Sequence, residues 1–326
     1  MRALITGAAG QDGTILSAML SQQGAELFGL VKPGAENEGV ATLQRYAPEI
    51  TLLEIDLADA DALQSTVRSV DPTHVWNFGG FSAPGASWDH QEEVTQINVD
   101  AVAALLSGVR EQARQARFFQ ASSATIFEGT DKAPQSESTE MEPKSPYAKS
   151  KARAMEIVRE ARADGIFACS GIFYNHESPL RGEGFVTRKI SQAVARIAAG
   201  LQSELELGDV EVARDWGWAP DYVRATLLML QADTPKDFVL ATGISHRLSF
   251  FIQRAFLAAG ISNWQEFVRS STTNTRPMDT NLMVGDSRAA YLELGWRHSV
   301  DFDSMARIMV EHDIALLSDP HALWKI

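Results

Sequence analysis

Short apolar runs alternate with amphipathic stretches through the first half of the chain. The runs that predict strands cover residues 3–6, 27–31, 51–54, 74–78, 117–120 and 167–173. Between them, apolar residues recur at helical spacing, which predicts helices over residues 14–22, 61–70, 94–113 and 147–163. Apolar strands that alternate with helices indicate a parallel sheet covered on both faces, and right-handed crossovers make such a sheet doubly wound. We therefore predict an α/β fold built on a Rossmann-type doubly wound parallel sheet.

The alternation changes after Asn175. A turn-rich stretch over 175–184 precedes further predicted elements, which are helices at 187–199, 221–230, 248–259 and 302–317 and strands at 205–207 and 238–242. We predict a dinucleotide-binding domain over residues 1–174, to which the chain returns near 215–245 and 284–300. Residues 175–326 then form mostly a smaller α/β substrate domain, interleaved with the first.

Composition narrows the classes of partner. The chain has 326 residues, 45% hydrophobic and 22% charged, which is typical of a well-cored globular protein. Acidic residues outnumber basic ones by 42 to 29, and the formal charge of −13 argues against nucleic acid or an anionic membrane as the main partner. The single cysteine, Cys169, excludes an internal disulfide framework and a multi-cysteine metal site. The sequence has neither a leader-like segment nor an apolar run of the ~20 residues that span a bilayer, so we expect a cytoplasmic protein. We expect no bound metal.

A glycine-rich turn follows the first predicted strand. Gly7, Gly10 and Gly13 have the spacing that permits a tight turn, a close approach of the backbone to a pyrophosphate, and packing of a helix against a strand. The N–H groups of such a turn, together with the helix dipole, attract a diphosphate. The segment therefore predicts dinucleotide binding, with Gln11 and Asp12 among the candidate contacts; the alternative is an ordinary strand–helix turn.

The ends of the next two strands bear on the choice of dinucleotide. An acidic residue after the second strand would bind the adenosine ribose of NAD, but Lys32 follows this strand. A lysine at this place pairs with a 2′-phosphate, so we expect NADP, with NAD as the alternative. Asp56 and Leu57 follow the third strand and are candidate contacts of the adenine.

The candidate catalytic group is a tyrosine and a lysine on one helix. Tyr147 and Lys151 are four residues apart and hence share a helix face. A free phenol is a poor base at neutral pH, and a nearby ammonium moves its pKa toward the working range. Tyr147 is then the base that takes a hydroxyl proton while hydride leaves the same carbon for nicotinamide. Ser123, Thr125 and Phe127 share a face if the segment after the fifth strand stays extended. Ser123 would then hydrogen-bond the oxygen being oxidised; the alternative is that these hydroxyls satisfy the local backbone.

These elements resemble the extended short-chain dehydrogenases/reductases that act on nucleotide sugars, and most of all the GDP-mannose 4,6-dehydratases. The resemblance covers nearly the whole chain and is most specific at 175–190, NHESPLRGEGFVTRKI. It implies NADP, a GDP-hexose and transient oxidation at C4 of the sugar. By position it implies that the nucleotide diphosphate or its base contacts Asn175, Lys189, Arg214 and Arg276. It also places Ser82 and Ser87, after the fourth strand, where the cofactor and the sugar meet; the alternative is that they are ordinary loop serines.

Two further expectations come with this resemblance. In related enzymes the helices that correspond to 94–113 and 147–163 form the helical bundle of a dimer, so we expect a homodimer or homotetramer. His176 lies in the most specific stretch of the resemblance. We interpret it as a structural hydrogen-bonding residue and not as a catalyst.

One position departs from the dehydratase pattern. In the dehydratases a glutamate two residues beyond the Ser/Thr removes the C5 proton, and this chain has Thr125 there. A threonine hydroxyl does not titrate near neutrality and cannot act as that base. Residues 122–127 are instead similar to the UDP-galactose 4-epimerases, which oxidise C4 and return the hydride without elimination. We therefore expect an epimerase or ketoreductase. The alternatives are a true GDP-mannose 4,6-dehydratase that uses Glu128 or water, and a catalytically silent nucleotide-sugar-binding paralogue.

Overall fold

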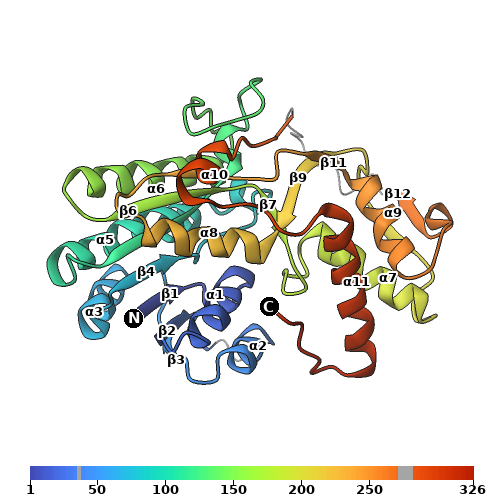
Figure 1. Cartoon of the computed structure of the whole chain (residues 1–326), viewed down its shortest axis with the longest axis horizontal. Helices are drawn as coiled ribbons and strands as arrows, with labels where there is room; N and C mark the ends of the chain where they lie inside the picture. Colours follow the sequence, from blue (N-terminus) through green and yellow to red (C-terminus); the bar gives the residue numbers. More distant parts are fainter. Residues whose placement is uncertain (35–37, 271–281) are drawn as a thin grey trace.

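The computed structural model describes residues 1–34, 38–270 and 282–326, and a parallel sheet forms its largest element (Figure 1). Within the described part this sheet has seven strands in the order β10-β6-β5-β4-β1-β2-β3. Their bounds are β1 Arg2–Thr6, β2 Glu26–Val31, β3 Thr51–Glu54, β4 His74–Asn77, β5 Arg117–Ser123, β6 Ala168–Phe173 and β10 Phe238–Leu240. The chain runs from β1 toward β3 in one direction and from β4 toward β10 in the other, so the direction reverses between β1 and β4. This confirms the predicted doubly wound fold.

Helices cover both faces of this sheet because its strands are apolar on both sides. The helices are α1 Gln11–Ser21, α2 Glu38–Tyr46, α3 Ala60–Val70, α5 Ala101–Gln112, α6 Pro146–Ala163, α8 Ala219–Gln231 and α10 Arg288–Leu294. In β1, the side chains of Ala3 and Ile5 join the core that includes α1 and α8, whereas Leu4 joins the core with α3, α5 and α6. A fully buried parallel sheet thus separates two apolar layers, as the continuous apolar runs predict.

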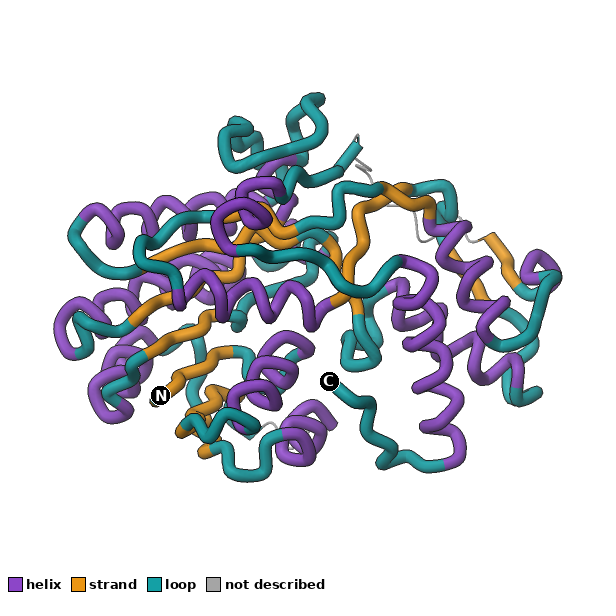
Figure 2. Tube along the Cα trace, viewed as in Figure 1, coloured by secondary structure: helices purple, strands orange, loops and turns teal. Residues whose placement is uncertain are grey.

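A second body lies beyond the carboxyl end of β6 (Figure 2), and in the described residues it contains two small sheets with helices packed on them. One sheet has the order β11-β9-β7 and the other pairs β12 with β8. The strands are β7 Asn175–Glu177, β8 Leu205–Leu207, β9 Ala213–Trp218, β11 Ser245–Arg247 and β12 Val268–Ser270. The helices α7 Val186–Ala198, α9 Leu248–Ala258 and α11 Phe302–Ser318 enclose a separate core with β8 and β9. Ligands of open α/β sheets bind at the carboxyl ends of the strands near the reversal of strand order, which is the side this body faces.

Several elements differ from the sequence prediction. The helix expected over 94–113 is divided into α4 Gln91–Thr95, the π-helical turn η2 Gln96–Asp100, and α5. The prediction missed α2, α10, β7, β9, β11 and β12. Most of these strands have three residues, too few for an alternating pattern to be visible. Among the described residues, the structure has no helix with the length and hydropathy that crossing a membrane requires.

Candidate active site

The glycine-rich turn between β1 and α1 is built for close backbone contact. Gly7 has a positive φ of 62°, and a Cβ placed on it would lie 2.7 Å from the backbone nitrogen of Gly79. A Cβ on Gly13 would lie 2.3 Å from the carbonyl oxygen of Gly7. Gly10 precedes α1, and no side chain caps the helix there. The first N–H groups of α1 are thus left for a ligand, and the cradle fits the diphosphate of a dinucleotide.

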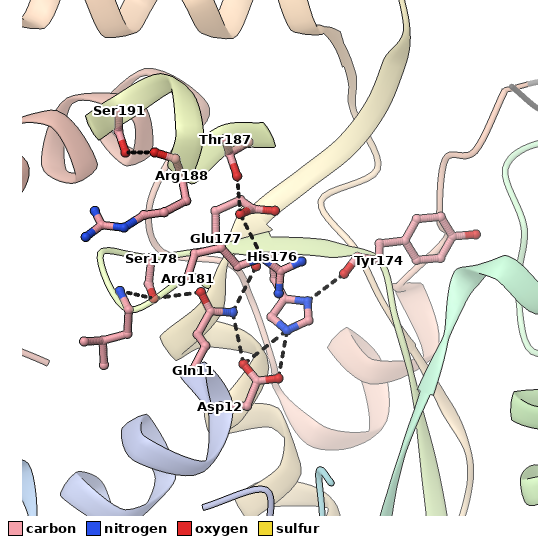
Figure 3. Close-up of polar contacts among 11 residues, drawn as sticks. Gln11, Asp12, Tyr174, His176, Glu177, Ser178, Arg181, Thr187, Arg188 and Ser191 are labelled. Atoms are coloured by element: carbon pink, nitrogen blue, oxygen red, sulfur yellow. Dashed lines mark hydrogen bonds and ion pairs between the residues drawn. The ribbon is translucent and has the colours of Figure 1, made fainter. Parts of the chain in front are cut away.

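The side chains of Gln11 and Asp12 point away from this cradle, toward the segment around β7 (Figure 3). Gln11 donates to the carbonyl oxygen of His176 at 3.1 Å and accepts from Ser178 at 2.8 Å. Asp12 lies 3.0 Å from Nε2 of His176, whose Nδ1 lies 2.8 Å from the carbonyl oxygen of Tyr174. Burial alone would raise the pKa of Asp12, but the charge and hydrogen bond of His176 lower it below its usual value. His176 is a hydrogen-bonding bridge, as the sequence predicts, and the β7 segment engages the side chains of Gln11 and Asp12.

Ser123, Thr125, Tyr147 and Lys151 come together at the carboxyl end of β5 and the start of α6. The hydroxyl of Thr125 donates to that of Ser123 at 3.1 Å, and Ser123 acts on the Tyr147 phenol by lowering its pKa. Lys151 Nζ lies 5.8 Å from the centroid of the Tyr147 ring and donates to the carbonyl oxygen of Ala121 at 3.2 Å. The predicted constellation is therefore assembled around one phenol.

Burial governs the protonation of this site. It raises the pKa of Tyr147, although the hydrogen bond from Ser123 and the charge of Arg181 lower it in part. Burial also lowers the pKa of Lys151 to about 8. The direction for Tyr147 is opposite to the sequence expectation, since desolvation of the phenolate outweighs the nearby positive charge in the chain alone. A ligand that brings further positive charge or hydrogen-bond donors would move the pKa of Tyr147 back down.

The sequence predicts an extended segment after Ser123. The structure has a helical turn there instead. Residues Ala124–Phe127 form the short 3₁₀ helix η3, and Ser123 caps it by accepting from the backbone N–H of Thr125 at 3.3 Å. Phe127 is consequently buried in the core and does not share a face with Ser123. The cap turns the chain away from the sheet, yet the turn still returns the Thr125 hydroxyl to Ser123. Glu128, the alternative acid, directs its carboxylate to the backbone of Lys144 instead.

Ser82 and Ser87 lie in the loop after β4. Ser82 is exposed, whereas Ser87 is buried and donates to the carbonyl oxygen of Pro84 at 2.6 Å. The Ser87 hydroxyl also accepts from the backbone N–H of Tyr147 at 3.3 Å. Ser87 therefore supports the start of α6 from beneath, and Ser82 has the freer side chain for a ligand.

The other predicted cofactor contacts lie at the ends of β2 and β3. Lys32 follows β2 and is exposed. Asp56 is exposed and accepts from the backbone N–H of Ala58 at 2.9 Å. Leu57 lies against the turn after β4, since a Cβ on Gly79 would be 2.7 Å from its Cδ1. These residues rim the carboxyl ends of the strands beside the glycine-rich turn.

The residues expected to bind the nucleotide of the substrate lie mostly in the second body. Asn175 begins β7, and Lys189 on α7 donates to the carbonyl oxygen of Glu206 at 2.8 Å. Arg214 on β9 donates to the carbonyl oxygen of Ala213 at 2.7 Å and makes a further interaction besides this bond. Arg276 lies outside the described residues.

Asn98 is a buried site residue that the sequence analysis missed. It lies in the π-helical turn η2, accepts from the backbone N–H of Phe81 at 2.8 Å and donates to Ser150 at 3.0 Å. These two hydrogen bonds join the loop after β4 to α6 at Ser150, the residue before Lys151. The sequence does contain a signal for this residue, namely an asparagine inside an otherwise apolar helical pattern. A buried amide requires hydrogen-bond partners, so such a residue indicates a polar contact within the core.

Arg181 is a second residue to which the sequence analysis assigned no role. Its Nε lies 3.2 Å from a carboxylate oxygen of Glu177, and its guanidinium lies 3.5 Å from the centroid of the Phe185 ring. Its positive charge acts on both Asp12 and Tyr147. Both groups thus sense the positive charge of Arg181, and such a charge attracts an anionic ligand.

Comparison with known proteins assigns this site to a family. Residues 4–309 match the family model described as "GDP-mannose 4,6 dehydratase". The chain is 36% identical over 326 residues to "GDP-mannose 4,6 dehydratase 1" of Arabidopsis thaliana, covering 96% of this chain and 90% of the relative. The chain belongs to the GDP-mannose 4,6-dehydratase family. It is accordingly an NAD(P)-dependent sugar-nucleotide enzyme of the dehydratase/epimerase type within the extended short-chain dehydrogenases/reductases.

Solved structures share the fold of this family member at lower identity. UDP-glucose 4-epimerase of Stenotrophomonas maltophila, with bound NAD, superposes with a TM-score of 0.83 at 22% identity, covering 98% of this chain and 99% of the epimerase. RMD from Pseudomonas aeruginosa, complexed with NADPH, gives a TM-score of 0.79 at 20% identity and covers 97% of this chain and 99% of that one. At such identities the likeness concerns the fold alone. Within the described residues, no three His, Cys, Asp or Glu side chains gather to hold a metal ion.

Replacing Lys151 by methionine tests the burial of its ammonium. The pKa of Lys151 lies at about 8 in the folded chain, against 10.5 ordinarily. A lowered lysine pKa destabilises the folded state at neutral pH, and this penalty disappears as the pH rises from about 8 to 10.5. We expect Lys151→Met to raise the free energy of unfolding at pH 7 by about 3 kcal/mol while abolishing activity. Chemical denaturation across that pH range should show the difference shrinking; a constant difference would contradict it.

Proposed function

We propose that this family member oxidises C4 of a GDP-hexose, with GDP-mannose as the first candidate substrate. The observation that supports this most directly is that Ser123 and Lys151 lie near the phenol of Tyr147, in a chain whose glycine-rich turn fits a dinucleotide. The dehydratase relatives support the GDP-sugar, and the exposed Lys32 after β2 supports NADP over NAD. Asn175, Lys189, Arg214 and Arg276 are the proposed contacts of the sugar nucleotide.

The chain's own groups suit the removal of a hydroxyl proton. Tyr147, as phenolate, accepts the proton of the C4 hydroxyl, and the hydroxyl of Ser123 hydrogen-bonds the same oxygen. The ammonium of Lys151, 5.8 Å from the ring, and the charge of Arg181 favour the phenolate. A bound nicotinamide supplies the acceptor, and later the donor, of the C4 hydride. Reprotonation by Tyr147 reverses the step when the hydride returns.

The family relationship supports loss of water after C4 oxidation, as in a 4,6-dehydratase. One observation favours a second outcome, epimerisation or ketoreduction. Thr125 stands where the dehydratase glutamate is expected, and its hydroxyl donates to Ser123. Glu128, which might have replaced that acid, is bonded to the backbone at the start of α6. A threonine cannot remove the C5 proton at neutral pH, so the C4 ketone would persist until it is reduced.

Product analysis distinguishes these outcomes. The purified chain is incubated with GDP-mannose and NADP⁺, and products are separated and weighed by mass spectrometry. Loss of one water supports the dehydratase, whereas an isomeric product, or a reduced product after a 4-keto sugar is supplied with NADPH, supports the second outcome. An absence of cofactor reduction and of turnover across GDP- and UDP-sugars would support the silent nucleotide-sugar-binding paralogue instead.

Thr125→Glu should restore the missing base. We expect this variant to form about 10²-fold more of the water-loss product from GDP-mannose than the wild type, because a positioned general base contributes at least this much. Thr125→Gln, of equal size without a titratable group, is the matched control and should form no more than the wild type. If the wild type already forms this product as fast as Thr125→Glu, the threonine does not prevent elimination.

The partners and the location of the chain extend this proposal. The faces of α5 and α6 are proposed to meet those of a second copy in a homodimer or homotetramer, as the related enzymes suggest. Light scattering of the purified chain tests this, and a monomer would contradict it. A cytoplasmic location fits substrates and cofactors of this kind and is proposed with them.

A further inference from the structure

The carboxylate of Glu128 joins the turn after β5 to the start of α6. Glu128 directly follows η3, and it accepts from the backbone N–H of Lys144 at 2.6 Å and from that of Ser145. The hydroxyl of Ser145 also lies 3.3 Å from the second carboxylate oxygen. Ser145 is itself the N-cap of α6 and accepts from the backbone N–H of Ala148 at 3.2 Å. One side chain therefore holds two adjacent donors at the entry to the helix that carries Tyr147.

Backbone contacts bring the same two segments into close register. The N–H of Glu142 donates to the carbonyl oxygen of Ile126 at 2.8 Å, and that of Gly129 donates to the carbonyl oxygen of Glu142 at 2.9 Å. A Cβ on Gly129 would lie 2.6 Å from the Glu142 carbonyl oxygen and 2.3 Å from Cε of Lys144. Only glycine permits this approach, so the junction is tight. The Glu128 carboxylate adds a side-chain link to this junction, and its partners Lys144 and Ser145 directly precede the first turn of α6.

This junction lies between the segments that carry the hydroxyls of Ser123 and Tyr147. Ser123 caps η3 on one side, and Tyr147 is the second residue of α6 on the other. How η3 and α6 are held together therefore sets the relative position of Ser123 and Tyr147. A negative charge beside the first N–H groups of a helix is also stabilising there.

We propose that Glu128 is a positioning residue that clasps the Ser123 turn to the first turn of the Tyr147 helix. Both of its oxygens serve as acceptors toward Lys144 and Ser145, and the clasp requires no proton transfer by the carboxylate. Its kinetic consequence rests on the proposed C4 oxidation, whereas its structural consequence does not.

Kinetics of three variants test the clasp. Glu128→Ala removes it, and we expect kcat for GDP-mannose oxidation to fall about tenfold, because small misplacements of reacting groups are costly. KM should change by less than about twofold, because the substrate contacts remain. Glu128→Gln should regain most of kcat, since its amide oxygen accepts from the same N–H groups. Glu142→Gln removes the same charge from a half-exposed side chain of the same loop and should behave as the wild type.

Hydrogen exchange of the backbone amides over residues 144–148 gives a readout independent of turnover. Exchange should be faster in Glu128→Ala and unchanged in Glu128→Gln and Glu142→Gln. If the wild type oxidises no GDP-sugar, the proposed function fails, and exchange still decides the clasp. The clasp is overturned if Glu128→Ala exchanges as the wild type does. It is also overturned if Glu128→Gln is as inactive as Glu128→Ala and loses one limb of the pH profile, which would mark Glu128 as a proton-transfer group.

Discussion

Replacing Tyr147 by phenylalanine is expected to lower kcat by about 10²–10⁴-fold, the contribution of a positioned general base. The variant loses only the phenol oxygen, so the packing of this nearly buried ring, which is 8% exposed, is preserved. Ser123 keeps its cap on η3, and KM for GDP-mannose should stay near the wild-type value. Initial rates of cofactor reduction with GDP-mannose measure both constants.

Tyr46→Phe is the matched control for this prediction. Its hydroxyl donates to the carbonyl oxygen of Trp324 at 2.7 Å, at the contact of α2 with the C-terminal segment. Removing that bond should lower the free energy of unfolding by about 1 kcal/mol and leave kcat unchanged. A Tyr147→Phe variant with more than a tenth of wild-type kcat would refute the phenol as the base.

The second large effect is expected at Gly13. A Cβ there would lie 2.3 Å from the Gly7 carbonyl oxygen and 2.6 Å from Cα of Ala8, and both are backbone atoms. Gly13→Ala must therefore open the turn and displace the N–H groups that would meet the diphosphate. We expect the affinity for NADP to fall at least about 100-fold, equivalent to about 2.7 kcal/mol. Fluorescence titration or calorimetry with NADP⁺ measures this loss.

Two further glycine variants calibrate that result. A Cβ on Gly184 meets nothing within 4 Å, so Gly184→Ala should bind NADP as the wild type does. A Cβ on Gly10 would lie 3.2 Å from the Gly7 carbonyl oxygen, and Gly10→Ala should lose less affinity than Gly13→Ala. Circular dichroism separates a binding defect from a failure to fold. Equal affinity of folded Gly13→Ala and wild type would exclude this turn as the dinucleotide site.

The sequence by itself determined the features that depend on neighbouring residues. Apolar runs and helical spacing located the strands of the large sheet, because a buried parallel sheet requires apolar side chains on both faces of every strand. The spacing of Tyr147 and Lys151 placed both on one helix face, since helical geometry relates residues four apart. The glycine spacing likewise located the cradle, because close backbone packing tolerates no Cβ.

Only the tertiary structure decided what depends on residues far apart in the chain. Asp12 and Gln11 meet the β7 segment more than 160 residues later, which turns their side chains from the cofactor cradle. Burial by surrounding elements raises the pKa of Tyr147, whereas the sequence showed only the nearby lysine. Ser123 caps η3. Glu128, which the sequence offers as an alternative acid, bonds to the backbone at the start of α6. Periodicity cannot report such contacts, because they are set by how separate elements pack and by which buried polar groups must find partners.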